Sequence, residues 1–233
     1  MAYMPHLAPF VALAFLGACF GLVALALAAA YGLVSKKAIV WKTAIALAAA
    51  GLGLYALLLF GSSLLSQTVV LAAGQHKYFC ELDCHIAYSV DSVTTAPAVG
   101  ISSQQITPQG TFYVVRLRTW FDPSTISAHR GNSPLVPNPR RVVVEDAAGR
   151  VFQRDTAAEA MFARTGVSST PLDEALRPGE SYSTTLIFDL PADARDARLL
   201  VTDNDPVTSI LIGHELSPLH AKIFFALVPQ ASH

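Results

Sequence analysis

Two long runs without a charged residue constrain this chain more than any other feature, and they cover Leu7–Val34 and Thr43–Leu65. Each run is longer than the roughly 20 residues that a helix needs to cross the core of a bilayer. Neither shows the polar stripe of a helix that packs on a soluble core. A cleaved secretory signal would need a basic start and a short apolar run, yet residues 1–9 hold no Lys or Arg. We therefore predict two retained transmembrane helices, with residues 1–70 as a two-helix membrane anchor.

The short link between the two runs predicts how they cross the membrane. It carries three lysines, Lys36, Lys37 and Lys42, whereas the outer flanks of both runs are almost uncharged. Lysine and arginine near span ends favour the cytoplasmic side. We expect the lysine-rich link in the cytoplasm of a bacterium, with both termini and the C-terminal domain in the periplasm beside the inner membrane.

The two runs also contain no His, Asp, Glu, Lys or Arg. Proton relays, ion paths and voltage sensors depend on such groups inside the membrane. Gly17 and Gly21 form a G-x-x-x-G pattern, which lets helix backbones approach closely. We expect these helices to pack against lipid and against helices of other membrane subunits, with Gly17 and Gly21 as contacts.

The charged residues are concentrated in the rest of the chain. No Asp or Glu precedes Glu81, and charged residues make up 14% of the whole sequence, against about 25% in a typical soluble domain. The remaining stretch of about 155 residues is long enough to bury a core of its own. A formal net charge of −1 gives no basic face for nucleic acid.

Short alternating segments separated by turn residues dominate this second part. Residues 111–121 and 181–190 alternate most clearly, and a hairpin with Gly149 at its turn joins residues 141–145 to 150–154. Further strands are expected at 86–93, 198–203 and 222–228, and one helix at 156–164 with Thr156 as its N-cap. This pattern is typical of an all-β antiparallel sandwich. We assign residues 71–104 to a juxtamembrane segment with the first strand and residues 105–233 to the sandwich.

A resemblance to a known family supports the sandwich. The segments Leu176–Glu180, Tyr182–Pro191 and Leu199–Val201 resemble a sequence pattern of telokin-like immunoglobulin-fold domains, and the similarity extends over roughly residues 105 to 228. Domains of that family are extracytoplasmic modules, often attached to membranes, and many have no known function. The resemblance implies an immunoglobulin-like fold and no catalytic residues.

One cluster just after the second run could carry chemistry. Cys80, Cys84 and His85 stand close together, with Glu81 and Asp83 between the cysteines. A disulfide between the cysteines suits an oxidising compartment. Covalent haem is a second reading, because the spacing is one residue longer than the usual C-x-x-C-H signal. A thiol redox centre is a third, although no thioredoxin-like βαβ unit surrounds the cluster.

Copper is the fourth reading of this cluster, since thiolates and imidazole suit that metal. The C-x-x-x-C spacing is similar to that of the binuclear copper loop of cytochrome oxidase and of its copper chaperones, which resemblance implies a distant histidine ligand such as His214 or His220. The residues that follow Cys84 depart from both patterns. We expect no cofactor, with copper held by Cys80, Cys84, His85 and His220 as the alternative.

These observations predict a non-catalytic accessory subunit of a larger inner-membrane complex of respiratory or photosynthetic type, rather than an enzyme. The loop from residue 121 to 139 is longer than most sandwich loops, and long loops often contact partners. It contains four prolines that we expect at the contact surface: Pro123, Pro134, Pro137 and Pro139. The alternative function is a membrane-tethered copper-binding or electron-transfer protein.

Overall fold

The structure of the chain is a computed structural model that describes residues 2–5, 7–79, 85–101, 104–127 and 129–230. The chain divides into two compact units. One comprises residues 6–67 and 205–221, and we call it the helical unit. The other comprises residues 1–5, 68–204 and 222–233, and we call it the sheet unit.

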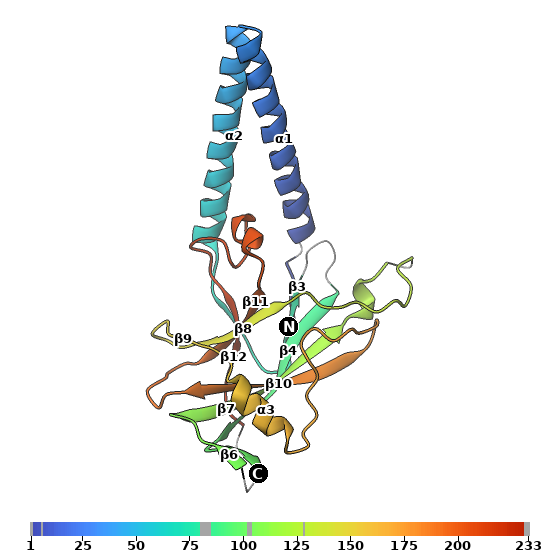
Figure 1. The fold of residues 1–233 in the computed structure, drawn as a ribbon, viewed down its shortest axis with the longest axis vertical. Helices are drawn as coiled ribbons and strands as arrows, with labels where there is room; N and C mark the ends of the chain where they lie inside the picture. Colours follow the sequence, from blue (N-terminus) through green and yellow to red (C-terminus); the bar gives the residue numbers. More distant parts are fainter. Residues whose placement is uncertain (1, 6, 80–84, 102–103, 128, 231–233) are drawn as a thin grey trace. The chain divides into compact units, whose positions relative to one another are not determined.

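The helical unit contains the two apolar helices that the sequence predicts. Helix α1 covers Ala8–Val34 and helix α2 covers Ala38–Leu65, and the two lie side by side (Figure 1). Both are long and apolar enough to cross a membrane. Their connection is tight, because a Cβ added at Gly32 would lie 2.7 Å from the backbone nitrogen of Trp41. A glycine at position 32 therefore lets the chain reverse between the helices.

A segment far along the chain belongs to this same unit. Residues 205–221 follow the sheet strand that ends at Asp203, and they contain the 3₁₀ helix η2 at Pro206–Ile210. The hydroxyl of Tyr55 donates a hydrogen bond to the carbonyl of Ile210 at 2.5 Å. The backbone amide of Ala221 donates to the hydroxyl of Ser66 at 2.7 Å. These two bonds join the segment to α2 and to the residue that follows it.

The sheet unit consists of two five-stranded sheets and one small two-stranded sheet. The strands of the first sheet, in spatial order, are β1 (Ala2–Tyr3), β3 (His76–Phe79), β4 (Ile86–Ala96), β7 (Thr111–Phe121) and β10 (Ser181–Leu190). Those of the second are β2 (Val69–Leu71), β12 (Ile223–Ala226), β11 (Arg198–Asp203), β8 (Arg140–Glu145) and β9 (Val151–Phe152). The small sheet pairs β5 (Val99–Ile101) with β6 (Gln104–Ile106).

Both five-stranded sheets bury side chains in one common core. Leu117 and Phe188 come from the first sheet, and Val144, Val201 and Phe225 come from the second. All five belong to one cluster of buried residues and are fully enclosed. Successive side chains of a strand point to opposite faces, so alternation along β7 and β10 supplies one face of this core. The two sheets form layers that pack on each other.

The three clearest strand predictions are confirmed to the residue, at 111–121, 181–190 and 198–203. The prediction that every pairing is antiparallel is wrong. Strand β1 pairs with β3 in parallel, and β2 pairs with β12 in parallel. A tight hairpin forces antiparallel pairing, whereas a long connection permits either direction. Both parallel pairs join strands separated by more than a hairpin loop, so local pattern does not determine their direction.

The single helix predicted in this unit is confirmed as α3, at Thr156–Ala163. Its predicted N-cap was one residue late. Asp155, not Thr156, is the N-cap, and its carboxylate accepts a hydrogen bond from the amide of Ala158 at 2.9 Å. Glu159, in the first turn of the helix, pairs with Arg154. An aspartate cap satisfies the helix start without a reciprocal glutamate.

Candidate functional site

A buried carboxylate organises one end of the first sheet. Asp122 directly follows β7 and is 5% exposed. One of its oxygens accepts from the hydroxyl of Tyr78 at 2.5 Å, and the other accepts from the amide and the hydroxyl of Ser124 at 2.8 and 2.7 Å. The amide of Asp122 itself donates to the carbonyl of His85 at 2.9 Å. Asp122 thereby ties β3, the start of β4 and the short helix η1 (Pro123–Thr125) together.

The histidine of the sequence cluster belongs to this network. Nδ1 of His85 lies 2.7 Å from the hydroxyl oxygen of Thr125. The same hydroxyl oxygen lies 2.9 Å from the carbonyl oxygen of Asp122, so Thr125 links His85 to the backbone of Asp122. The ring also stacks on Phe121 with centroids 5.5 Å apart and is 5% exposed.

The electrostatics of this network favour an ionised carboxylate. Burial by itself raises the pKa of Asp122, but the hydrogen bonds from Ser124 and Tyr78 outweigh it and leave that pKa below its usual value. Burial and the bond to Asp122 raise the pKa of Tyr78 above its usual value. Burial, together with the charge of Arg118, lowers the pKa of His76, whose ring lies 5.1 Å from that of Trp120. An aspartate with three donors acts as an anchor of structure rather than as a base.

What this network positions is the long loop that begins at Asp122. Further along the loop, Arg130 donates to the carbonyl of Ser133 at 2.7 Å and stacks over Phe121 at 4.7 Å. Arg177 donates to the carbonyl of Asn132 at 3.1 Å. Leu135 and Leu176 form an isolated β-bridge through both of their amides. The loop is therefore held in place at its start, its middle and its end.

The predicted contact residues on this loop differ in accessibility. Pro123, Pro134 and Pro139 are exposed, and so is Val136, at 59%. Pro137 is buried, which leaves it no surface to offer. In the helical unit, a Cβ added at Gly17 or at Gly21 would meet no atom within 4 Å. The glycine face of α1 is thus open within the described chain.

The metal hypothesis receives no direct evidence. Cys80 and Cys84 lie outside the described residues, and the described residues contain no group of three or more His, Cys, Asp or Glu side chains arranged to hold a metal. His220, which belongs to the helical unit, has Nδ1 2.6 Å from the carbonyl of Ala221. Nδ1 of His214 accepts from the amide of Leu216 at 3.1 Å. Copper at this cluster stays a prediction, which elemental analysis of the purified protein would test.

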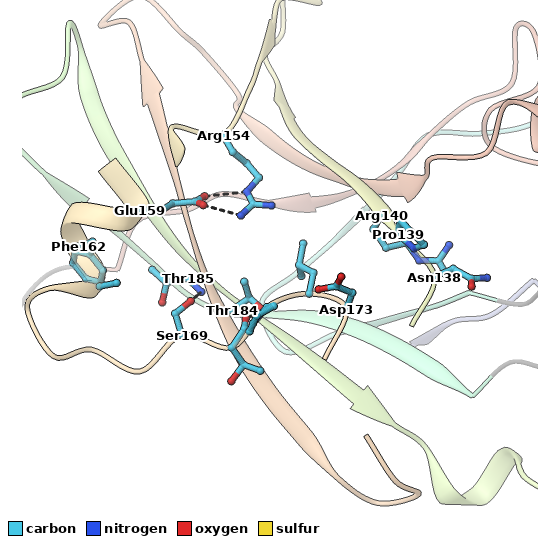
Figure 2. A pocket seen from close by; sticks show the side chains of 14 residues that line it. Asn138, Pro139, Arg140, Arg154, Glu159, Phe162, Ser169, Asp173, Thr184 and Thr185 are labelled. Carbon is cyan, nitrogen blue, oxygen red and sulfur yellow. Dashed lines mark hydrogen bonds and ion pairs between the residues drawn. The ribbon is translucent and has the colours of Figure 1, made fainter. Parts of the chain in front are cut away.

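A cavity of about 470 Å³ in the sheet unit is a second candidate site that the sequence did not indicate. Figure 2 shows its wall, to which α3, β10 and the chain between them contribute. Arg154 and Glu159 form a two-bonded ion pair there, at 3.0 and 2.7 Å. The amide of Thr185 donates to the hydroxyl of Ser169 at 2.9 Å.

The polar groups of this cavity mostly satisfy one another. Glu159 accepts a third bond, from the amide of Ile187 at 3.1 Å, and Arg140 pairs with Asp203. The arginines of the wall are thereby neutralised by carboxylates of the same chain. Hydrogen bonds from the amides of Ile187 and Thr185 join α3 and the loop that follows it to β10.

A buried lysine is the feature of the sheet unit that sequence reasoning missed most clearly. Lys77 is 2% exposed, and its Nζ donates to the carbonyl of Val201 at 2.6 Å and to that of Ile223 at 3.1 Å. Lys77 lies in the first sheet, and both acceptors lie in the second. The ammonium also lies 5.0 Å from the ring centroid of Phe79. This lysine joins the two layers, as buried charges require partners.

Comparisons with known proteins name no family for this chain. No protein-family profile matches the sequence, and no curated protein matches it. Solved structures align with part of it. A conserved hypothetical protein from Bacillus anthracis aligns at 20% identity and a TM-score of 0.38, over 51% of this chain and 81% of its own. The yjhA protein from Bacillus subtilis aligns at 10% identity and a TM-score of 0.40, over 68% and 100%.

The secreted protein MPT63 from Mycobacterium tuberculosis aligns at 12% identity and a TM-score of 0.41, over 69% of this chain and 97% of its own. Likenesses of this size establish neither a family nor an activity.

Proposed function

We propose that this protein is a non-catalytic accessory subunit of a bacterial inner-membrane complex of respiratory or photosynthetic type. Helices α1 and α2 anchor it, and its periplasmic domain, an immunoglobulin-like sandwich, contacts partner subunits. The single observation that carries this proposal is the uncovered surface of α1, on which Phe10, Phe20 and Leu27 are 67–74% exposed. An apolar surface of that kind needs lipid or other apolar helices around it.

Two further features support partner binding. The face of α1 at Gly17 and Gly21 is open, which suits close approach by a helix of another subunit. The loop between Asp122 and Pro139 is held by hydrogen bonds at several points while Val136 stays exposed. A preorganised loop loses little conformational entropy when it binds a partner.

Crosslinking at two phenylalanines of α1 tests the partner proposal. Phe20 is 74% exposed and lies one helical turn from Gly17, whereas Phe15 faces Tyr55 of α2 with ring centroids 6.4 Å apart. A benzoylphenylalanine at Phe20 should crosslink to a second protein in native membranes. The same probe at Phe15, the matched control, should react within the chain. Lipid adducts alone at Phe20, with a monomer after mild solubilisation, would contradict the proposal.

Protease treatment of intact spheroplasts tests the orientation separately. The sheet unit should be cut from outside, while the lysine-rich link at Lys36 and Lys37 should be protected until lysis. Protection of the sheet unit in intact spheroplasts would place it in the cytoplasm and overturn the periplasmic assignment.

A further inference from the structure

The segment 205–221 is a loop of the sheet unit by sequence and a part of the helical unit by packing. It leaves β11 after Asp203 and returns to β12 at Ile223, yet its compact unit is that of α1 and α2. The Tyr55 hydroxyl bonds to the carbonyl of Ile210, and the amide of Ala221 bonds to the Ser66 hydroxyl. The segment is therefore attached to α2 at two levels.

The attachment at Tyr55 lies within the apolar part of α2. Trp41 and Lys42 are suitable interfacial anchors at one end, and about 20 residues from there span the roughly 30 Å of a hydrocarbon core. That length ends near Gly61. Tyr55 comes six residues earlier, which corresponds to about 9 Å along the helix axis. Its partner Ile210 is thus placed about 9 Å inside the hydrocarbon boundary, in the outer part of the acyl region.

The backbone of the segment is unusually self-sufficient for an irregular stretch. Every third amide donates to the carbonyl three residues before it, at 2.9–3.2 Å, and the donors are Thr208, Leu211, His214, Ser217 and His220. The hydroxyls of Thr208, Ser209 and Ser217 also donate to backbone carbonyls of the segment, each at 2.6 Å. Irregular backbone next to lipid must satisfy its polar groups internally, because hydrocarbon offers them no partner.

The large side chains that this arrangement turns outward are apolar, and the exposed acid Asp205 lies at the start of the segment. Val207 is 50% exposed, Ile210 45% and Leu219 71%, whereas the acidic Glu215 is buried at 8%. The sequence holds no lysine or arginine between Arg198 and Lys222. Contact through this surface would therefore rest on apolar burial rather than on attraction to anionic lipid.

We propose that residues 205–221 insert into the bilayer interface at the C-terminal end of α2, with Val207, Ile210 and Leu219 in the lipid. This inference rests on the proposed membrane anchoring by α1 and α2. Such an insertion gives the sheet unit a third point of attachment to the bilayer, after the two helix ends. In this proposal lipid covers the exposed surface of residues 205–221. The competing outcome is that a partner subunit covers it.

Depth-dependent quenching tests the proposal on the full-length protein in nanodiscs of zwitterionic phosphatidylcholine. An environment-sensitive fluorescent amino acid replaces Ile210, Leu57 in the apolar part of α2, or Val151 in β9, which is 45% exposed like Ile210. Bromines are placed near the headgroup end or near the methyl end of the acyl chains. We expect shallow bromines to quench the probe at Ile210 about threefold more than the probe at Val151, as insertion by 5–10 Å would give.

The outcomes distinguish failure of the proposed insertion of residues 205–221 from failure of the proposed anchoring by α1 and α2. Quenching at Leu57 with none at Ile210 would leave the anchor intact and overturn the insertion. No quenching at Leu57 would overturn the anchor, and the insertion with it. A photocrosslinker at Leu219 in native membranes should give lipid adducts, and a protein adduct there would overturn the choice of lipid. Tyr55→Phe, which removes only the hydroxyl, should lower the quenching at Ile210 while leaving that at Leu57 unchanged.

Discussion

The helical unit and the sheet unit differ in which types of side chain they bury and which they expose. Phe20 in α1 is 74% exposed, whereas Phe225 in β12 is 0% exposed. Polar residues show the converse: Lys77 and Asp122 are enclosed in the sheet unit and each is fully engaged by hydrogen bonds. The same residue types thus face outward in one unit and inward in the other. The proposed membrane anchor accounts for this difference by two solvents, water around the sheet unit and hydrocarbon around the helices.

The two units also differ in whether their backbone hydrogen bonds are local or join distant parts of the chain. In α1 and α2 every bond of the helix ladder is local, so these elements are complete without tertiary contacts. In the sheet unit the long strands depend on strands that are distant in sequence, as β7 depends on β10. We therefore expect mutations in the two units to act on different measurements.

The largest effect on folding should come from the core of the sheet unit. Phe225→Ala should lower the free energy of unfolding by about 3–5 kcal/mol, because it leaves a cavity between the layers. Urea unfolding of the full chain in detergent micelles, followed by near-ultraviolet circular dichroism, measures this loss. The matched change Phe20→Ala in α1 should leave that transition in place. An equal loss from both variants would contradict the division into two solvents.

The next largest effect should be on membrane insertion. Leu52→Arg places a charge in the middle of α2, at a cost of about 2.5–3.5 kcal/mol on insertion scales. The protein should then partition away from the membrane fraction resistant to alkaline extraction. Leu64→Arg, at the end of α2 where a long side chain reaches the interface, should cost less. Equal extraction of both variants would argue against a spanning α2.

The buried carboxylate network should give a smaller effect that depends on pH. Asp122→Asn should cost about 1–3 kcal/mol at pH 7, because it removes a charged acceptor from Tyr78 and Ser124. The folded-state pKa of Asp122 lies below its usual value, so the ionised form stabilises the fold above about pH 4 and that stabilisation is lost as the pH falls further. Unfolding curves from pH 7 to pH 3 should show the wild-type protein and the variant converge.

His76 acts in the same direction over a different pH range. Its folded-state pKa is lowered, so protonation favours the unfolded chain, and this contribution to stability falls as the pH drops below about 6.5. The difference between wild-type protein and Asp122→Asn should therefore change mainly below pH 4. A difference that stayed constant down to pH 3 would show that folding does not lower the pKa of Asp122.

The smallest effect is expected at an exposed ion pair of the sheet unit. Nε of Arg118 lies 3.0 Å from a carboxylate oxygen of Asp91, with side-chain exposures of 48% and 24%. Asp91→Asn should cost less than about 1 kcal/mol and should cost still less in high salt, since water and ions screen the pair. Thermal unfolding at two salt concentrations measures it, and a salt-independent loss would point to a packing role.

The sequence by itself determined the helices and the clearest strands. Uninterrupted apolar runs predict α1 and α2, and strict alternation predicts β7 and β10, because in both cases the pattern is local and repeats over many residues. The short strands β1 and β3 carry too few residues to show a periodic pattern. Only their pairing with other strands in the folded sheet identifies them as strands.

The candidate sites depended on the tertiary structure to a greater extent. The sequence singled out His85, but not Asp122, Tyr78 and Thr125, which lie 37, 7 and 40 positions from it and bond or connect to it through the fold. From the sequence alone, Lys77 would be interpreted as a charge beside the membrane. In the structure, two strands of the other sheet supply its hydrogen-bond acceptors. From the sequence alone, residues 205–221 would be interpreted as a loop between strands. The hydrogen bond from Tyr55 to Ile210 is what joins them to α2. Hydrogen bonds between distant segments decide such placements, and no short stretch of sequence encodes them.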